Sequence, residues 1–375
     1  MLRHHHLIKY LFSRELSEIY ISIGMKDLAL AMAGIFVPLY LYVDMGYSLN
    51  KIFLFFIIYA LAMIFSAPLA AKFISRYGVK HGILISTFGL IVYLILLITL
   101  PSHNLFYIPP FIWGIANAFY WLSFHTDFAK FSDKKNRGRE VSMWFITAFL
   151  GVLFGPIIGS IIITYLGFAI LFVIVSLLLL LSAVPLFLSS DVYPKEEFNF
   201  KYIFKRSHLK DTYLYITMGF RLMIGQLAFP LFIFILLSGY IQLGAIASLS
   251  ALGSIVVGYF VGKMSGDGKK EKTMFRYGAL SHSMGLFGLI FVKTFVQLAV
   301  INVYLAISYI FVDIPHHTMV YDKARRERNM MEYFVYREMM LSVGRFLGVF
   351  VLLLTGKFVV GFVITGLGML SWFFL

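Results

Sequence analysis

The sequence comprises 375 residues, of which 60% are hydrophobic and only 13% are charged, with a mean hydropathy of +0.86. This composition excludes an ordinary soluble domain and predicts a protein integral to a lipid bilayer. The absence of cysteine excludes disulfides and thiolate metal sites. A net charge of +14 is compatible with nucleic-acid binding, but the basic residues occupy short stretches between apolar runs. Membrane topology explains them better, and we expect no nucleic-acid partner.

A short basic segment, 1–18, opens the chain and precedes an apolar run too long for the core of a cleaved signal peptide. We therefore expect this run to remain as the first membrane span. Three adjacent histidines, His4 to His6, have no further ligands at the spacing that metal sites require. They are better explained as a solvated tail, and we expect neither a metal nor a cofactor.

Twelve apolar segments follow, each long enough to cross a hydrocarbon core of about 30 Å at about 1.5 Å per residue. They lie at 19–43, 50–71, 81–100, 104–129, 141–164, 167–189, 212–238, 240–262, 273–292, 294–320, 333–355 and 357–375. The expected fold is all-α and integral to the membrane, with one six-helix bundle over 19–189 and a second over 212–375. A cytoplasmic linker, 190–211, joins the two bundles.

Lysine and arginine concentrate in alternate loops of this arrangement. The count assigns Lys51, Lys293 and Lys357 to the opposite loops, and Lys26, Arg221 and Arg345 to the spans. Because loops rich in these residues stay in the cytoplasm, the asymmetry predicts that both termini are cytoplasmic. We expect the cell (inner) membrane as the location.

The two halves share a pattern at a separation of about 193 residues. The matching features are His125-Thr126 with His317-Thr318, Asn136 with Asn329, Gly151 with Gly344, and Gly155 with Gly348. A constant separation over four features predicts a duplicated unit. In a membrane protein, such repeats place a binding site near the midplane between the halves.

Two loops resemble a signature of the major facilitator superfamily, G-x-x-x-D-R-x-G-R-K. In AKFISRYGVKHG, residues 71–82, the matches are Arg76, Gly78 and Lys80; in VGKMSGDGKKEK, residues 261–272, they are Gly268 and Lys270. The resemblance implies cytoplasmic loops that brace a transport cycle. Both copies carry serine, Ser75 and Ser265, in place of the usual aspartate, which puts the family's charge latch in doubt. A turn with positive-inside charge explains the same residues.

The fifth span contains GVLFGPIIGS, which is similar to the G-x-x-x-G-P-x-x-G-G helix of proton-driven exporters in that superfamily. Gly151, Gly155, Pro156 and Gly159 match, and Ser160 departs. Small residues four apart let helix backbones approach closely, and proline bends the helix beside them. These residues therefore predict tight packing between the halves, or an additional role in closing a cavity.

Several ionisable residues lie deep in the predicted spans. Counting about 1.5 Å per residue from flanking charges places Lys26 roughly 12 Å deep and Arg221 and Asp313 roughly 15 Å deep, whereas Asp127 falls near the surface. A charge at such depth is costly unless it is paired or hydrated, so it is a functional hypothesis by default. The alternative is a structural ion pair, in which Lys26 neutralises Asp313 or Asp27.

We therefore expect Lys26 and Arg221 to bind the substrate. Tyr120 and Gln226 complete the predicted substrate-binding set. Asp313 is the main candidate for proton coupling, and the further candidates are Asp27, Asp127, His125, His316 and His317. Histidine titrates near neutral pH, which suits proton transfer, although a hydrogen-bonded structural role explains each histidine equally well. For Arg345 we favour a structural contact with a helix end or with the opposite half.

Enzyme motifs are absent from the sequence. SGDGKKEKT lacks the spacing of a phosphate-binding loop, and neither H-E-x-x-H nor G-x-S-x-G occurs. With the apolar segments, the repeat and the deep charges, the sequence predicts a monomeric, proton-coupled secondary transporter. We expect it to move a small anionic or zwitterionic organic solute by alternating access. Proton-driven export of amphipathic compounds is an alternative, and a non-transporting membrane scaffold or sensor is an alternative of another class.

Overall fold

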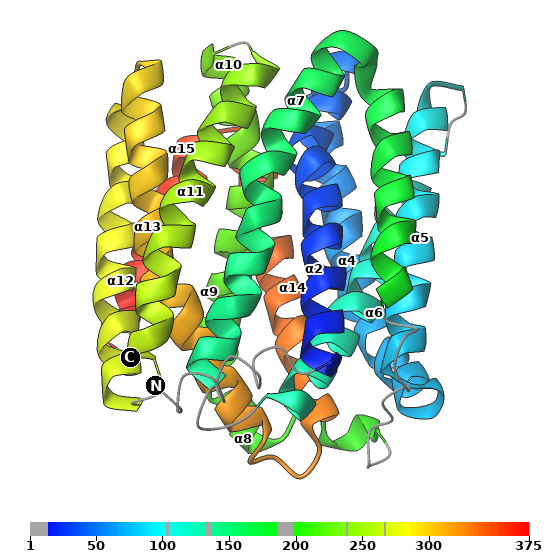
Figure 1. Cartoon of the computed structure of the whole chain (residues 1–375). Coiled ribbons are helices and arrows are strands. Elements are labelled where there is room, and N and C mark those ends of the chain that lie inside the picture. Colours follow the sequence, from blue (N-terminus) through cyan, green and yellow to red (C-terminus); the bar gives the residue numbers. More distant parts are fainter. Residues whose placement is uncertain are drawn as a thin grey trace.

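The computed structural model describes residues 14–102, 105–132, 137–185, 198–237, 239–265 and 268–374, and within these ranges the regular structure is entirely helical (Figure 1). The elements are α2 (Arg14–Ala33), η1 (Gly34–Phe36), α3 (Val37–Leu39), η2 (Tyr40–Asp44), α4 (Leu49–Tyr77), α5 (Val79–Thr99), η3 (Leu100–Ser102), α6 (Ile108–Phe131), α7 (Arg137–Ala183), η5 (Phe200–Tyr202), α8 (Arg206–Leu209), α9 (Thr212–Met223), η6 (Ile224–Ala228), α10 (Phe229–Leu237), α11 (Tyr240–Met264), α12 (Gly268–Gly288), η7 (Leu289–Phe291), α13 (Phe295–Ala324), α14 (Met330–Thr355) and α15 (Phe358–Trp372). We call α2 to α7 the N-terminal helices and α9 to α15 the C-terminal helices.

Eight helical segments in the described ranges are long and apolar enough to cross a membrane. Helix α7 has 47 residues, and it is broken at Gly167, whose backbone adopts a φ of 83°. At about 1.5 Å per residue it is roughly twice the length of one crossing, and Figure 1 shows its ribbon turning back at the upper end. Helices α6, α12 and α15 occupy three other predicted spans without meeting the same test. The count of twelve crossings therefore stays a prediction.

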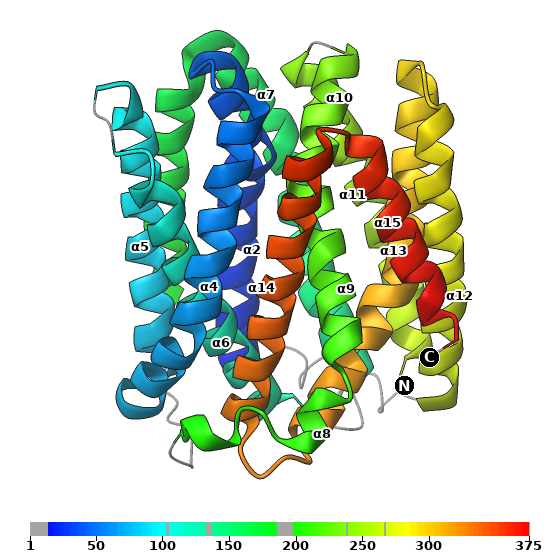
Figure 2. The ribbon, with the colours of Figure 1, turned by 180° about the vertical axis from the view of Figure 1, so that it is seen from behind.

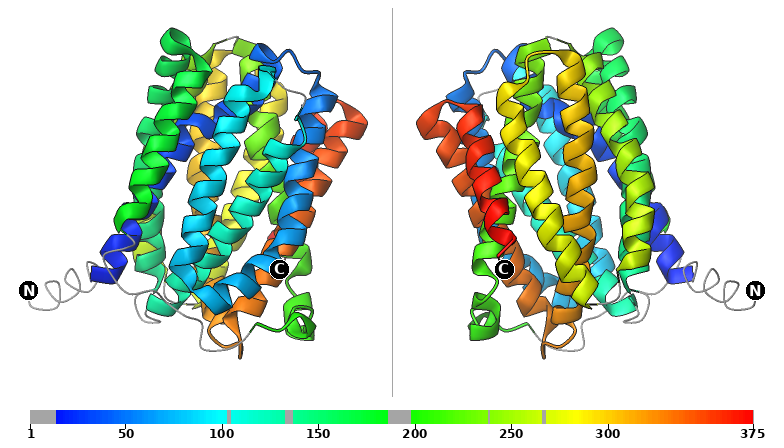
Figure 3. Two further views of the ribbon diagram at one scale, coloured as in Figure 1. Left: turned by 90° about the vertical axis from the view of Figure 1, so that its right-hand side faces the viewer. Right: turned by 90° about the vertical axis from the view of Figure 1, so that its left-hand side faces the viewer.

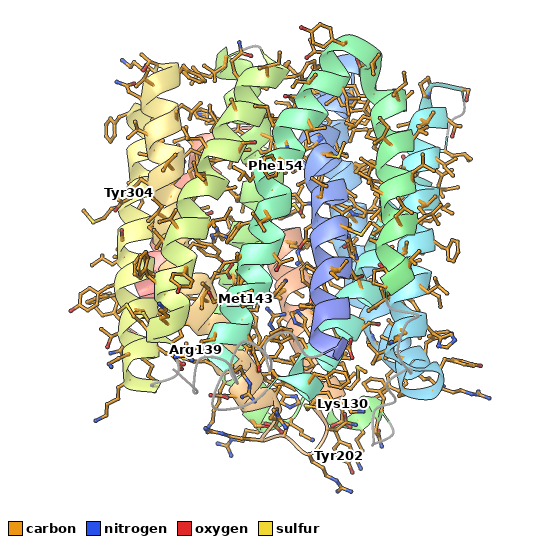
Figure 4. All side chains as sticks on the ribbon, in the orientation of Figure 1. Lys130, Arg139, Met143, Phe154, Tyr202 and Tyr304 are labelled. Carbon is orange, nitrogen blue, oxygen red and sulfur yellow. The ribbon has the colours of Figure 1, made fainter. Side chains whose placement is uncertain are left out.

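Apolar side chains point outward over much of the bundle. Phe154 on α7 and Tyr304 on α13 are 54% and 41% exposed at its outer surface (Figure 4). Lys130, Arg139 and Tyr202 lie instead at the end that carries α8, which we call the α8 end. A surface that is apolar along its sides and basic at one end is the arrangement expected of a protein in a bilayer.

Helix α2 begins and α15 ends at the α8 end (Figures 2 and 3). This arrangement agrees with the expectation that both termini lie on one side. Residues 1–13 and 186–197 fall outside the described ranges, so most of the predicted segment 1–18, including His4 to His6, and part of the linker 190–211 are not covered.

The first helix of each group contains a π-helical turn close to a proline. The helix from α2 continues through η1 and α3 into the π-helical turn η2, and α9 continues through the π-helical turn η6 into α10. Pro38 lies just before η2, and Pro230 lies just after η6. A π-helical turn widens the helix locally and is frequent at functional sites.

The glycines of α7 bring it into direct contact with α2. A Cβ atom added at Gly151 would lie 2.5 Å from the amide nitrogen of Leu28, and one added at Gly159 would lie 2.0 Å from the carbonyl oxygen of Met32. The small residues are therefore required by close helix packing. This contact of the glycines lies within the N-terminal helices. The expected packing between the halves occurs on the other side of α7, which meets α11: a Cβ at Gly244 would lie 2.7 Å from the Pro156 carbonyl oxygen.

The same contact recurs in the C-terminal helices. A Cβ added at Gly344 of α14 would lie 2.0 Å from the carbonyl oxygen of Ile216, and one added at Gly348 would lie 3.3 Å from that of Phe220. Helix α14 thus packs on α9 as α7 packs on α2. The glycines that match in the sequence repeat also match in the helix that they contact.

Candidate functional site

A cavity of about 390 Å³ lies between the N-terminal and C-terminal helices. Residues of α2, α4, α5, α6 and α7 form one wall, and residues of α9, η6, α13 and α14 form the other. We call it the central cavity. Its position between the two groups of helices is where a repeated transporter fold is expected to hold its substrate.

The wall formed by the N-terminal helices is mainly aromatic. The ring of Trp113 stacks on Tyr59 at a centroid distance of 4.0 Å and on Tyr93 at 5.1 Å. Trp121, Trp144 and Phe145 extend this wall. Rings that stack on each other are held in fixed orientations, so this wall offers a rigid apolar surface to a ligand.

The wall formed by the C-terminal helices carries the charges. Its polar members are Gln226, Asp313, His317, Arg337, Glu338 and Arg345, whereas the opposite wall contributes only Asn117 and His125 among the described lining residues. The cavity is therefore asymmetric, with aromatic rings on one side and ionisable groups on the other.

Arg337 connects several of the ionisable groups. Its Nη1 donates to Glu338 Oε1 at 2.5 Å and to His125 Nε2 at 3.0 Å, and its Nη2 donates to His317 Nε2 at 3.3 Å. Arg337 and Glu338 are buried. A buried ion pair of this kind needs further hydrogen bonds to offset the cost of removing its charges from water, and the two histidines supply them.

These contacts determine which ring nitrogen carries the proton in each histidine. Because arginine can only donate, each Nε2 must accept, and the proton of the neutral ring resides on Nδ1. His125 Nδ1 lies 2.7 Å from the Tyr321 hydroxyl, and His317 Nδ1 lies 3.0 Å from the backbone carbonyl oxygen of Asp313. The same His317 nitrogen is 3.4 Å from the Asp313 carboxylate.

Arg345 lies two turns further along α14 on the same cavity wall. Its Nη1 donates to the Ser342 hydroxyl at 3.1 Å and contacts the sulfur of Met63 at 3.5 Å. Among the residues that the structure describes, no carboxylate forms an ion pair with it. The structure therefore places Arg345 on the cavity wall as a cation with neutral partners, and its contact with Met63 of α4 is a contact with the opposite half, as the sequence indicated.

Polar contacts join the two groups of helices at the α8 end. Arg137 at the start of α7 forms an ion pair with Asp322 of α13, and Arg325 donates to the backbone carbonyl oxygen of Ser132. Two further contacts, His125 with Tyr321 and His125 with Arg337, also join the two groups of helices. At the opposite end we find ring contacts of Tyr240 with Phe36 and Phe168, at 6.4 and 5.8 Å.

The structure does not bring Lys26 and Arg221 together. The Lys26 ammonium lies 2.6 Å from the centre of the Tyr120 ring, and both residues are buried behind the cavity wall. The Arg221 guanidinium lies 3.1 Å from the centre of the Tyr309 ring and lines a second cavity. Of the predicted substrate-binding residues, Gln226 is the one that lines the central cavity.

The proton-coupling candidates also separate. His125, His317 and Asp313 line the central cavity, whereas His316 packs between the rings of Tyr215 and Phe275. Asp27 neighbours Lys26 and lies outside the lining. Asp127 lies near the end of α6, as its counted depth indicated, and its side chain is buried, at 3% exposed.

The residues of the loop signature form helix ends. Gly78, with a φ of 98°, makes the turn between α4 and α5, a conformation that favours glycine. Arg76 is exposed over Tyr77, and Lys80 is buried. Gly268 and Lys270 begin α12. A Cβ at Gly138 would lie 2.7 Å from Ser265, so the second loop packs against the start of α7 across the two groups of helices.

Sequence reasoning missed Arg337 and Glu338. The charge count placed Arg337 with the loops, but α14 begins at Met330 and buries it. The spacing of Arg337, Glu338, Leu341 and Arg345 contains the signal, since residues at i, i+4 and i+7 or i+8 share one helix face. The aromatic wall gave no comparable signal, because rings that line a cavity and rings that face lipid look alike in an apolar segment.

The chain matches the Major Facilitator Superfamily over residues 19–349. With the helical fold and the cavity between its two groups of helices, this match defines the class: the chain belongs to the Major Facilitator Superfamily.

Two individual proteins are similar to it. The uncharacterized protein YqgE of Bacillus subtilis (strain 168) is 25% identical over 357 residues, covering 88% of this chain and 80% of its own. The human organic anion transporter MFSD10 (TETRAN) has a similar structure, with a TM-score of 0.72 and 13% identity, over 96% of this chain and 98% of that one. At this identity the structural likeness concerns the fold alone.

Proposed function

We propose that this protein is a secondary transporter that moves a small organic anion or zwitterion through the central cavity by alternating access. The observation that carries the proposal is the asymmetry of the cavity, in which Arg345 faces a wall of stacked aromatic rings. An organic carboxylate has the matching chemistry, with a charged end for the guanidinium and an apolar body for the rings.

The acids on the same wall define the substrate further. Glu338 is engaged by Arg337, whereas Asp313 has His317 as its close partner. An ammonium group on the substrate would find Asp313 in the same cavity, which supports a zwitterion as well as a simple anion. MFSD10, whose fold is similar, is by its title an organic anion transporter. This likeness supports the proposal without defining the substrate.

Alternating access needs contacts that can open at one end while they form at the other. The polar contacts between the two groups of helices concentrate at the α8 end, which the lysine and arginine count predicts to be cytoplasmic. We therefore interpret this conformation as closed to the cytoplasm. Opening requires the Arg137–Asp322 ion pair and the contacts of His125 to separate.

Proton coupling follows from the hydrogen bonds of His125. A proton bound at Nε2 would turn this atom from an acceptor into a donor and so end its bond with Arg337. The Glu338 carboxylate, 3.6 Å away, would then accept a hydrogen bond from the protonated Nε2. Tyr321 from α13 and His317, with a ring centroid 6.3 Å away, face the same imidazole. Protonation of His125 would thus loosen the contact between the two groups of helices. Asp313 and His317 are the neighbouring pair that would carry the proton.

Uptake into proteoliposomes tests this proposal. A panel of radiolabelled aromatic monocarboxylates and aromatic amino acids should include a compound with saturable uptake that Arg345→Gln abolishes and Arg345→Lys partly restores. Arg276→Gln is the matched control, because Arg276 is an exposed cation on α12 that does not line the cavity. Uptake that is unaffected by Arg345→Gln, or absent for the whole panel, would count against the proposal.

Proton-driven export of amphipathic compounds is a second candidate, favoured by the glycine and proline residues of α7 and by the stacked rings at Trp113. Efflux of a fluorescent organic cation from loaded vesicles distinguishes it. Efflux that requires Asp313 but not Arg345 would favour this candidate over the first. A scaffold or sensor would instead tolerate replacement of Asp313 and Arg345 without loss of function.

A further inference from the structure

A second cavity, of about 290 Å³, lies among the C-terminal helices. Residues of α9, η6, α11, α12, α13 and α15 enclose it, with Phe149 of α7 at its edge. We propose that this cavity is a separate binding site for a short-chain monocarboxylate, with Arg221 as its anion-binding residue. The inference is independent of the proposed function, because it concerns a different cavity.

Helix α9 separates the two cavities. Successive residues of a helix turn by about 100°, so residues three and four apart share a face. Met218, Leu222 and Gln226 present one face to the central cavity, whereas Arg221 and Gly225 present another to the second cavity. A ligand at Arg221 is therefore on the far side of α9 from the central cavity.

The charge of the second cavity favours an anion. Arg221 is the charged residue of its described lining, which includes no aspartate or glutamate. The guanidinium lies 3.1 Å from the centre of the Tyr309 ring, and its buried Nε has no hydrogen-bond partner among the described residues. A half-buried cation whose Nε lacks a hydrogen-bond partner gains from a carboxylate, because fixed donors in a low dielectric are not competed for by water.

Further polar groups surround the guanidinium. His282 donates from Nδ1 to the Leu305 carbonyl oxygen at 2.9 Å, so its other ring nitrogen is an acceptor and does not bind a carboxylate. Asn302 of α13 adds an amide to the lining. The hydroxyls of Ser254 and Thr365 already donate to backbone carbonyls, at 3.0 and 2.7 Å. Arg221 and Asn302 are donors that fit a carboxylate.

The rest of the lining is apolar and limits the ligand's length. Phe229, Leu286 and Phe362 face the cavity together with Gly225. A Cβ atom added at Gly225 would meet nothing within 4 Å, so open space lies directly beside the π-helical turn η6. A carboxylate with a short apolar chain would pair with the Arg221 guanidinium and fill this space.

Binding of hexanoate to the purified full-length protein tests the inference. The measurement is made in Arg345→Gln, so that a carboxylate bound at the central cavity does not contribute, with hexanamide as the uncharged control. We expect hexanoate, but not hexanamide, to raise the Tm of Arg345→Gln with increasing concentration, since a ligand that binds the native state stabilises it. Equilibrium dialysis with labelled hexanoate should give one site per chain.

Two additional changes locate the site. Arg221→Gln removes the cation, and Gly225→Leu fills the open space without an initial clash. Either change, added to Arg345→Gln, should abolish the Tm shift and the bound hexanoate. Displacement of hexanoate by palmitate from vesicles would support the site and identify the bilayer as the ligand's source. Displacement only by soluble carboxylates would also support the site and identify the aqueous phase as the source. Loss of binding in Arg345→Gln alone, equal stabilisation by hexanamide, or binding that survives Arg221→Gln would overturn the inference.

Discussion

Arg337 of α14 and His125 of α6, 212 positions apart in the chain, are joined by a hydrogen bond of 3.0 Å at the end of the central cavity. The bond links the C-terminal helices to the N-terminal helices, and it holds an imidazole in its neutral form beside a buried ion pair. Under the proposed function, closure of the cavity and the binding of a proton depend on the same pair of residues.

Replacing Arg337 should destabilise the protein and loosen the α8 end. Arg337→Gln leaves Glu338 buried without its cation, and breaking a buried pair in this way costs about 3 to 5 kcal/mol. We expect a lower Tm in detergent. The double variant Arg337→Gln with Glu338→Gln removes both charges and should recover much of the loss. If the double variant is less stable than Arg337→Gln alone, the ion pair is not the source of the effect.

The Arg137–Asp322 ion pair should control opening at the α8 end. Arg137→Glu places two acids together, whereas the exchanged pair Arg137→Glu with Asp322→Arg restores the attraction. Transport should fall in the single variant and recover at least in part in the exchanged pair. Arg139→Glu, at an exposed neighbouring position, is the control for a change of charge alone. Equal transport by Arg137→Glu and Arg139→Glu would mean that the ion pair does not govern opening.

The glycines of α7 should be intolerant of larger side chains. A Cβ at Gly155 would lie 2.7 Å from that of Ala31 and 3.0 Å from the Leu28 carbonyl oxygen, so Gly155→Leu forces α7 away from α2. Overpacking of this kind costs about 1 to 3 kcal/mol. Gly34→Leu is the matched control, because a Cβ at Gly34 meets nothing within 4 Å. The packing account fails if the two leucine variants have the same Tm.

Asp313 should be required for coupling and not for substrate exchange. Its carboxylate is 3.4 Å from His317 Nδ1 in the cavity wall, so Asp313→Asn removes a proton carrier while keeping the shape of the side chain. Proteoliposomes with this variant should exchange labelled substrate down its gradient and fail to accumulate it when a proton gradient is imposed. Accumulation by Asp313→Asn equal to that of the parent protein would assign coupling to another group.

The membrane fold could be predicted because the length of each apolar segment and the positions of glycine and lysine are visible in the sequence itself. The glycines of α7 and α14 were recognised for the same reason, since close helix contact requires them wherever they meet a partner. The site was only partly predicted. Asp313, His125, His317 and Gln226 line the central cavity as expected, but depth along a helix does not specify direction around it.

That missing direction explains the error over Lys26 and Arg221. Both cations lie at similar positions along their helices, yet Arg221 faces away from the central cavity and Lys26 lies over Tyr120. Arg345 makes the expected contact with the opposite half, through Met63, and also lines the cavity.

Labelling of a single cysteine in the central cavity tests the alternating-access account most directly. The chain contains no cysteine, so Asn117→Cys introduces the sole thiol on the cavity wall. In vesicles of known orientation, we expect a membrane-impermeant maleimide to label it from the outside and not from the cytoplasmic side. Adding Arg137→Glu should reverse this preference, with cytoplasmic labelling rising as external labelling falls. Labelling from both sides at once, or a preference that Arg137→Glu leaves unchanged, would contradict the account.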